Sequence, residues 1–411
     1  MMKVAAIVFA SVLAVSFGQD SNPQGCINAS DFSADFDYFP DKVSANYSEF
    51  WNVDYFKTYK ILRNEITGTS YVLYQCGTEP PALNGSTSLI SVPIQDGCAI
   101  ASTADIPYIE LLGARTQMKG WVGYSGGVDA ISSSCVDQLL SEGRFLDVPQ
   151  PANTSSPEFK ALLALSGAGD QMVAFIADYD TPPALNNTVI VSSYTESSNF
   201  GALEWLKFYS VFFNLEAEAN SRFDAIVERY NCGKENAQTV LTDSQDKPIA
   251  VWAYYTNYSG VDGFDVAECP NYYCEYADDC GATLLESREG SNILNDTYSN
   301  TLYVYMNITE FVEFAKTANH WFYPSNNWDT TYALYKTELD ALPSVQNQRV
   351  FDYQKRNGSS SWFENRFAEP GTWLLLLLVC TIIVSIMVKN FCFVFNEFIT
   401  IAYRCRVAGL L

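Results

Sequence analysis

The longest hydrophobic pattern in the chain predicts a helix over residues 199–231. After Gly201 this stretch contains no glycine and no proline, and its polar residues recur every three or four positions. That spacing places them in one narrow stripe along an α-helix, flanked by apolar and aromatic residues. Asn231, Cys232 and Gly233 then supply a stop signal. We therefore expect an unbroken helix that is covered by protein on most sides, and its residues 201–230 alone would span about 45 Å, at roughly 1.5 Å per residue.

Shorter segments on both sides of this helix alternate between strand and helix patterns. The predicted strands cover residues 69–77, 89–102, 118–125, 170–180, 187–194, 248–258, 320–326 and 348–355. The predicted helices cover residues 104–114, 156–166, 309–318 and 330–342. In the second of these helices, Ser156 is expected to cap the N-terminus, with Pro157 at the first helical position. Strands that alternate with helices are typical of parallel α/β sheets, so we predict a parallel sheet on each side of the long helix.

The predicted fold is therefore α/β, with two Rossmann-like lobes joined by one long backbone helix. A single helix between two lobes allows only limited hinge motion, which favours a ligand held in the cleft between the lobes. The predicted parts are a signal peptide at 1–18, an N-terminal α/β lobe at 19–198, the connecting helix at 199–231, a C-terminal α/β lobe at 232–370, a transmembrane helix at 371–390 and a short cytoplasmic or interfacial tail at 391–411.

The two ends of the chain carry targeting patterns. Lys3 precedes a short apolar run that ends in small residues near Gly18, as in a secretory signal. Residues 371–388 contain no charge and are long enough to span a bilayer. Arg404 and Arg406 follow, as the positive-inside rule expects. We therefore predict a single-pass protein of the plasma membrane or another secretory-pathway membrane, with its N-terminal region extracellular or lumenal.

Sequons and cysteines indicate the same compartment. Nine Asn-x-Ser/Thr sequons all precede the C-terminal apolar segment. The predicted glycosylation sites are Asn28, Asn46, Asn84, Asn153, Asn186, Asn257, Asn295, Asn307 and Asn357. An even number of cysteines lies in the same region, so we predict that all of them form disulfides, with the pairing left open. These cysteines are Cys26, Cys76, Cys98, Cys135, Cys232, Cys269, Cys274 and Cys280. The spacing at residues 269–280 is not that of a zinc site.

Composition argues against several classes of function. The net charge of −23 disfavours nucleic acid or an anionic membrane as a partner. The single histidine, His320, excludes a multi-histidine metal site and disfavours histidine-based hydrolysis. No phosphate-binding loop or nucleophile motif occurs in a suitable context. We therefore predict a binding protein and not an enzyme.

Five segments, taken in order, resemble one family of bacterial binding proteins. They cover residues 37–62, 71–81, 102–113, 202–220 and 350–358. The chain resembles, over roughly residues 35–370, the iron-siderophore/cobalamin type of periplasmic substrate-binding protein of ABC transporters, the class with one helical backbone between lobes. The predicted glycosylation and membrane segment would make it a membrane-anchored, eukaryote-like form of that family.

The resemblance implies a receptor for uptake of a metal chelate, such as an iron-siderophore, a cobalamin or another tetrapyrrole. It implies no chemistry on the ligand and no permanently bound cofactor, only a ferric or cobalt chelate as cargo. It also implies a membrane partner, which would be a transporter or, in a eukaryote-like form, an endocytic protein.

Ligands of α/β sheets lie beyond the carboxyl ends of the strands, and this rule selects the candidate site. The predicted ligand-binding residues are Ser102, Thr103, Tyr124, Tyr179, Glu196, Trp252, Tyr254, Tyr255, Tyr258, Asn327, Trp328 and Arg356. Aromatic side chains suit a bulky chelate, because they bury area with little loss of entropy. Arg356 is expected to hold an oxygen anion through its planar guanidinium fork.

Two alternatives stay open. Tyrosine pairs with nearby carboxylates could bind ferric iron directly, because both supply hard oxygen ligands, although adjacent strand tyrosines point to opposite faces. The residues concerned are Tyr254, Tyr255, Tyr272, Tyr273, Asp262, Asp265 and Glu275. Alternatively, the chain is a surface protein for adhesion or structure that retains the fold without the ligand, which its sequons and acidity also fit.

Overall fold

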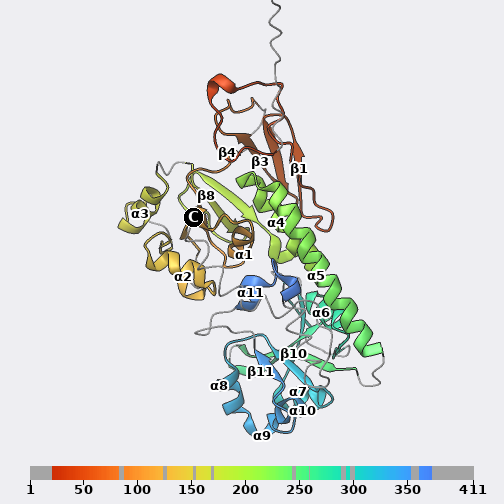
Figure 1. The fold of residues 1–411 in the computed structure, drawn as a ribbon. Coiled ribbons are helices and arrows are strands. Elements are labelled where there is room, and N and C mark those ends of the chain that lie inside the picture. The colour runs from red at the N-terminus through yellow and green to blue at the C-terminus, as the bar shows by residue number, and fades with distance from the viewer. Residues whose placement is uncertain are drawn as a thin grey trace, which may run out of the picture.

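The computed structural model describes residues 21–372, apart from residues 83–87, 124–126, 151–153, 168–170, 243–246, 259, 288–292, 297–300 and 353–360. Within these ranges the chain forms two α/β lobes. Figure 1 shows one lobe above the other, with helix α5 (Glu216–Thr242) running along one side from the first lobe to the second.

The N-terminal lobe contains two sheets. The first has the order β1-β2-β3-β4 and is antiparallel except between β3 and β4. Its strands are β1 (Trp51–Tyr55), β2 (Tyr59–Asn64), β3 (Thr69–Gln75) and β4 (Ser88–Val92). The second sheet is wholly parallel, in the order β7-β6-β5-β8-β9. Its strands are β5 (Cys98–Ile100), β6 (Met118–Trp121), β7 (Leu146–Asp147), β8 (Val173–Ala177) and β9 (Asn187–Val191).

The parallel sheet is covered on both faces. All five residues of β8 are buried, as expected for a parallel strand between two helical layers. Phe159 and Leu162 of α3 pack with one face, and the rings of Tyr209 and Phe212 lie 5.0 and 5.2 Å from the Phe175 ring on the other. The predicted cap of α3 is confirmed, since the Ser156 side chain accepts a hydrogen bond from the Phe159 backbone. The helices of this lobe are α1 (Asp105–Leu111), α2 (Ser134–Ser141), α3 (Pro157–Leu165) and α4 (Asn199–Phe213), with short 3-10 turns η1 (Ala29–Asp31), η2 (Arg115–Gln117), η3 (Val128–Ala130) and η4 (Ser193–Thr195).

The C-terminal lobe contains a mixed sheet, so the prediction of a parallel sheet is only partly right there. The sheet has the order β13-β14-β11-β10-β15-β16, with β12 also paired to β10. β10 pairs parallel with β15 and antiparallel with β11, because only two residues separate β10 from β11 in the sequence. The strands are β10 (Ile249–Tyr258), β11 (Val261–Glu268), β12 (Thr283–Leu284), β13 (Ile293–Asp296), β14 (Thr301–Met306), β15 (His320–Tyr323) and β16 (Val350–Asp352). The helices are α6 (Tyr272–Asp279), α7 (Ile308–Ala315), α8 (Trp328–Leu334), α9 (Lys336–Leu339), α10 (Pro343–Gln346) and α11 (Ser361–Asn365).

The predicted single helix over residues 199–231 is wrong, because the chain reverses at Asn214. Helix α4 ends at Phe213, and Asn214 adopts the left-handed conformation at φ 55° before α5 begins. The rings of Phe200 and Tyr230 lie 5.0 Å apart across the reversal, so α4 and α5 are antiparallel. Helix α4 therefore belongs to the N-terminal lobe, and α5 carries the chain from there to the C-terminal lobe.

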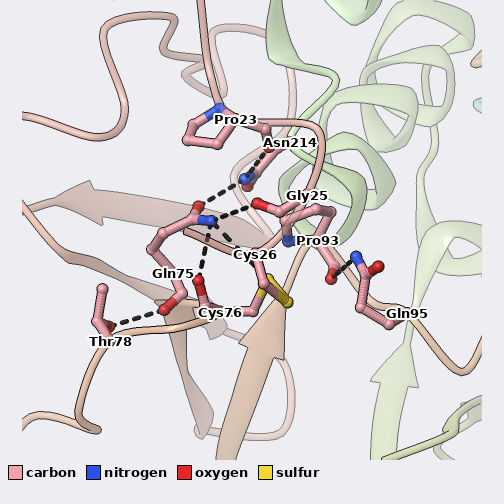
Figure 2. The surroundings of a disulfide bond; sticks show 9 residues. All are labelled: Pro23, Gly25, Cys26, Gln75, Cys76, Thr78, Pro93, Gln95 and Asn214. Carbon is pink, nitrogen blue, oxygen red and sulfur yellow. Dashed lines mark hydrogen bonds between the residues drawn. A yellow bond between two sulfur atoms is a disulfide. The ribbon is translucent and has the colours of Figure 1, made fainter. Parts of the chain in front are cut away.

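A buried polar network fixes this reversal. The Asn214 amide donates to the Pro23 carbonyl at 2.8 Å and to Gln75 Oε1 at 3.0 Å (Figure 2). Lys60 Nζ donates to Asn214 Oδ1 and to the Val211 carbonyl, each at 2.8 Å. It also lies 2.5 Å from Glu216 Oε1 at the start of α5. The turn is thus tied to both the N-terminal segment and the first sheet.

The polar stripe on α4 faces the protein interior instead of solvent. Glu204 is fully buried and accepts hydrogen bonds from the backbone N–H groups of Asn46, Tyr47 and Ser48, at 2.7–2.9 Å. Its other oxygen lies 3.0 Å from Lys207 Nζ. Two charged residues in a helical stripe therefore organise the loop before β1 and do not mark a surface.

The prediction that all eight outer cysteines form disulfides is wrong for Cys98 and Cys280, which are buried thiols. Figure 2 shows the disulfide between Cys26 and Cys76 beside the Asn214 network. A second disulfide joins Cys269 to Cys274, and Cys135 and Cys232 are also disulfide-bonded. Cys98 is a free thiol in the buried strand β5, and burial raises its pKa. It therefore acts as a small apolar core residue.

We expect Cys98 to be alkylated only after unfolding. The native protein should leave it unmodified by iodoacetamide, because its thiol is buried and protonated. In denaturant without a reductant, mass spectrometry should find it carbamidomethylated, while Cys26 and Cys76 stay linked. Modification of Cys98 in the native protein would contradict this placement.

The two predicted membrane-targeting segments lie outside the described residues, except that Gly371 and Thr372 are helical. Among the described residues, no helix is long and apolar enough to cross a membrane. Glycosylation stays a prediction. The sequon side chains that the structure describes are all exposed, and they are Asn28, Asn46, Asn186, Asn257 and Asn307. The side chains of the other four, Asn84, Asn153, Asn295 and Asn357, lie outside the described residues.

Candidate functional site

A cleft of about 400 Å³ lies between the two lobes. This volume falls in the range of small-molecule sites. Strand ends of the parallel sheet build one wall. Ser102 and Thr103 follow β5, Tyr179 follows β8, and Ser193 and Tyr194 follow β9. These residues therefore lie beyond the carboxyl ends of the strands, where the strand-end rule expects a ligand.

The opposite wall comes from the C-terminal lobe and is mostly aromatic. Tyr254 of β10 and Tyr303 of β14 contact edge to face, with ring centroids 5.8 Å apart. Tyr272 and Tyr273 open helix α6, and Asn271 caps this helix by accepting from the backbone N–H of Tyr273 at 2.7 Å. Trp252 stacks behind Tyr273 at 4.1 Å. The tyrosines are thus held by a cap and by core packing.

The floor of the cleft is formed by the segment after α11, which contributes Phe363, Arg366 and Phe367. The guanidinium carbon of Arg366 lies 3.6 Å from the Tyr272 ring centroid and 3.5 Å from that of Phe367. The residue is only 4% exposed, and its Nε has no hydrogen-bond partner among the residues that the structure describes. None of the described carboxylates is ion-paired with it. A stacked guanidinium is therefore held at the cleft without a counter-charge.

Asp105 is the carboxyl group that lines the cleft among the described residues. It lies in the first turn of α1 and is 2% exposed. Its Oδ1 accepts a hydrogen bond from the Tyr209 hydroxyl at 2.6 Å, whereas none of the described residues donates to Oδ2. Burial raises the pKa of this carboxyl to about 7, a shift that the Tyr209 hydrogen bond opposes. Its charge state thus changes near neutral pH.

Four of the predicted site residues line the cleft: Ser102, Thr103, Tyr179 and Tyr254. Tyr124, Arg356 and the side chain of Tyr258 lie outside the described residues. The remaining five do not line it. They are Glu196, Trp252, Tyr255, Asn327 and Trp328.

Four of those five side chains make hydrogen bonds or packing contacts within the fold, and Tyr255 is described in the next paragraph. Glu196 is buried against the Ser48 hydroxyl and accepts from the Trp205 indole at 2.9 Å. Trp252 stands behind the tyrosine wall. Asn327 accepts from the Tyr323 hydroxyl at 2.7 Å, and the Trp328 ring packs 5.1 Å from the rings of Trp321 and Tyr323. An aromatic or polar residue near a strand end thus packs within the fold about as often as it lines the cleft.

Direct iron binding by the pair Tyr254 and Tyr255 is not supported by the geometry. Tyr255 points away from the cleft and donates to Asp262 at 2.6 Å, whereas its neighbour Tyr254 lines the cleft. Alternation along β10 separates the two, as for any strand. Among the described residues, no group of three or more histidine, cysteine or acidic side chains is placed to hold a metal ion.

Comparison with known proteins gives distant likenesses. No family model matches the chain. A curated relative, an uncharacterized lipoprotein of Methanocaldococcus jannaschii, is 23% identical over 229 residues, which is 53% of this chain. The chain spans about half of that relative, with 49% of its length covered.

Solved structures with a similar arrangement are periplasmic binding proteins. A haem-binding protein of Pseudomonas aeruginosa matches with a TM-score of 0.48 and 13% identity, over 72% of this chain and 95% of that one. The petrobactin-binding protein of Bacillus subtilis matches with a TM-score of 0.49 and 11% identity, over 79% and 98%. The vitamin B12-binding protein of Vibrio cholerae matches with a TM-score of 0.42 and 11% identity, over 71% and 98%. Likenesses of this size do not assign a ligand to this chain.

The predicted localisation, a single-pass protein of the plasma membrane or another secretory-pathway membrane, is wrong. The curated relative is a prokaryotic lipoprotein. The eukaryote-like form, the single-pass anchor and the endocytic partner that followed from that prediction have no support. The length and hydropathy of an apolar segment do not by themselves identify the cellular compartment of a protein.

Proposed function

We propose that this protein binds an anionic metal chelate in the cleft between its lobes, and that Arg366 holds an oxygen anion of that chelate. The observation that carries the proposal is the buried guanidinium of Arg366, which lines the cleft and has no ion-pair partner in the described part of the chain. A charged group taken out of water without a counter-charge costs several kcal/mol. An anionic ligand would supply the missing partner, so the cleft favours anions.

The remaining surface of the cleft supports a chelate over a small inorganic anion. Six tyrosines line it, and they are Tyr179, Tyr194, Tyr254, Tyr272, Tyr273 and Tyr303. Flat aromatic faces bury ligand area with little loss of entropy, and their hydroxyl groups supply hydrogen bonds at the rim. A phosphate or sulfate ion would leave most of the 400 Å³ and the aromatic wall unused. Iron-siderophores and tetrapyrroles with carboxylates combine a bulky body with anionic oxygens.

The proposal includes no chemistry on the ligand. The two lobes meet at the cleft, so closure around a chelate would shield it from water. We further propose, on the sequence resemblance given above, that the bound chelate is passed to a membrane transporter.

Arg366→Lys should weaken chelate binding by about tenfold or more. Lysine keeps the charge but lacks the planar fork that binds a carboxylate with two hydrogen bonds and stacks on aromatic rings. Binding is measured by quenching of intrinsic fluorescence during titration with a panel of ferric siderophores, haem and cobalamin. Arg63→Lys is the matched control, because Arg63 is ion-paired with Asp54 in the first sheet and does not line the cleft.

Two outcomes would contradict the proposal. If no chelate of the panel binds more tightly than about 1 mM, the cleft is not a chelate site. That result would favour the alternative function in adhesion or structure. If a chelate binds and Arg366→Lys leaves its affinity unchanged, the anion site is elsewhere.

A further inference from the structure

Asp105 and Arg366 line the same cleft but do not form an ion pair with each other. Both side chains are at least 95% buried. Asp105 belongs to α1 of the N-terminal lobe, whereas Arg366 follows α11 and stacks on Tyr272 of the C-terminal lobe. An ion pair between these two side chains would satisfy both charges and leave neither of them available to a ligand. Within the described ranges, each side chain retains a polar atom without a partner, namely Asp105 Oδ2 and Arg366 Nε.

We infer that the ligand is amphoteric: besides the anionic group held by Arg366, it carries a cationic hydrogen-bond donor, of the alkylammonium kind, that binds Asp105. This inference rests on the proposed function and specifies the class of chelate. A purely anionic chelate would meet Arg366 but would also place its negative charge near the carboxyl group of Asp105. A ligand with opposite charges at its two ends satisfies both walls at once and fixes its orientation across the cleft.

The described groups that face Asp105 include no cation, so a counter-charge for its carboxylate would come from the ligand. The groups that face it are the Tyr209 hydroxyl from α4, the Cys98 thiol from β5, the backbone of Ser102, the Tyr108 hydroxyl from α1, and Tyr179 and Asp180 after β8. None of these is a cation, and Asp180 adds a second negative charge. A buried carboxyl in such a setting stays partly neutral until a cation arrives.

The charge state of Asp105 gives the inference a pH signature with a defined sign. Its pKa of about 7 means that it is mostly neutral below pH 6 and mostly ionised above pH 8. A cationic ligand group binds the ionised form, so its affinity should rise as the pH increases from 6 to 8. A ligand that instead accepts a hydrogen bond from the neutral carboxyl would show the opposite trend.

The test uses four forms of one ferric trihydroxamate chelate. One form carries a terminal ammonium and a terminal carboxylate, one only the ammonium, one only the carboxylate and one neither. Each is titrated against the wild-type protein, Asp105→Asn and the control Asp35→Asn, whose side chain is 97% exposed. Haem and ferric citrate serve as anionic chelates without an ammonium group.

The form with both charges should bind most tightly to the wild type. Removing its ammonium should weaken binding about tenfold or more, the scale of a hydrogen bond between charged groups. The same removal should have little effect in Asp105→Asn, because the acceptor charge is already gone. In Asp35→Asn the loss should equal that of the wild type.

Other results would overturn the inference. It fails if the ammonium makes no difference in the wild type, if the loss persists in Asp105→Asn, or if haem or ferric citrate binds more tightly than every trihydroxamate form. It also fails if affinity for the form with both charges falls between pH 6 and 8. In each of these cases binding that still depends on Arg366 leaves the proposed function standing. Binding of no chelate at all would reject both.

Discussion

Replacing Lys60 with methionine will lower the free energy of unfolding by about 3–5 kcal/mol, the usual cost of breaking a buried ion pair by removing one partner. Lys60 Nζ and Glu216 Oε1 lie 2.5 Å apart, and both side chains are 0% exposed. Methionine fills a similar volume, so the loss comes from charge and hydrogen bonding and not from a cavity. Glu216 would keep only the Asn22 amide at 2.7 Å and a long contact with the Tyr55 hydroxyl at 3.4 Å.

Two further variants separate this electrostatic effect from general damage. Lys60→Met combined with Glu216→Gln should recover much of the loss, because the uncompensated buried charge is then absent. Lys57→Met should cost less than about 0.5 kcal/mol, since Lys57 is 55% exposed and its partner Asp35 lies in solvent. Urea unfolding followed by fluorescence measures all three variants.

The stability loss caused by Lys60→Met should also depend on pH. The single variant should become less damaging as the pH falls, because an unpaired buried carboxylate takes up a proton readily. A single variant that is no less stable than Lys57→Met at pH 7 would show that the pair contributes nothing net. In that case hydrogen bonds, and not the ion pair, would stabilise the chain reversal at Asn214.

The reversal itself shows where a hydrophobic pattern stops being informative. The spacing of polar residues continues from α4 into α5 without a break, so Asn214 reads as one more member of the stripe. Asparagine tolerates the left-handed conformation that ends helices, but a single asparagine rarely identifies such an end. What decides the matter is the set of partners around it, Lys60, Gln75 and Pro23, which come from distant parts of the chain.

The candidate site also has one part that sequence rules select and one part that they do not. The wall built from strand ends was predictable, because buried apolar runs identify strands and their carboxyl ends fix the edge of a sheet. Tyr272 and Tyr273 enter from the first turn of α6, and Arg366 follows a short helix, so no strand-end rule selects them. The sequence signal available was Asn271 before the tyrosine pair, which is typical of a helix N-cap.

The position of Arg366 depends on the tertiary packing of the segment around it. Trp362, at 2% exposure, packs in the core of the C-terminal lobe with its ring 5.2 Å from Trp252. Phe367 belongs to the core of the N-terminal lobe, and Glu364 accepts from the Ser132 backbone at 2.5 Å on that side. The chain thus crosses between the lobes a second time within a few residues. Arg366 lies at this crossing, which explains why its side chain reaches the cleft.

Replacing Asp105 with asparagine will stabilise the protein, and the gain will grow with pH. Burial raises the pKa of Asp105 from 3.8 to about 7, so the folded protein retains a proton there that the unfolded chain releases above pH 4. The wild type therefore loses stability as the pH rises from about 4 to about 7. Asparagine has no such titration and can still accept the hydrogen bond from Tyr209.

Relative to the wild type, Asp105→Asn should gain roughly 2–3 kcal/mol more at pH 8 than at pH 5, at about 1.4 kcal/mol for each unit of pKa shift. Urea unfolding at the two pH values measures this difference, with Asp35→Asn as the control in solvent. A gain that is the same at pH 5 and pH 8 would contradict the raised pKa. A residue that costs stability in the empty protein, yet weakens binding of an amphoteric chelate when it is replaced, is what a ligand contact is expected to be, because binding sites retain charges that folding alone would remove.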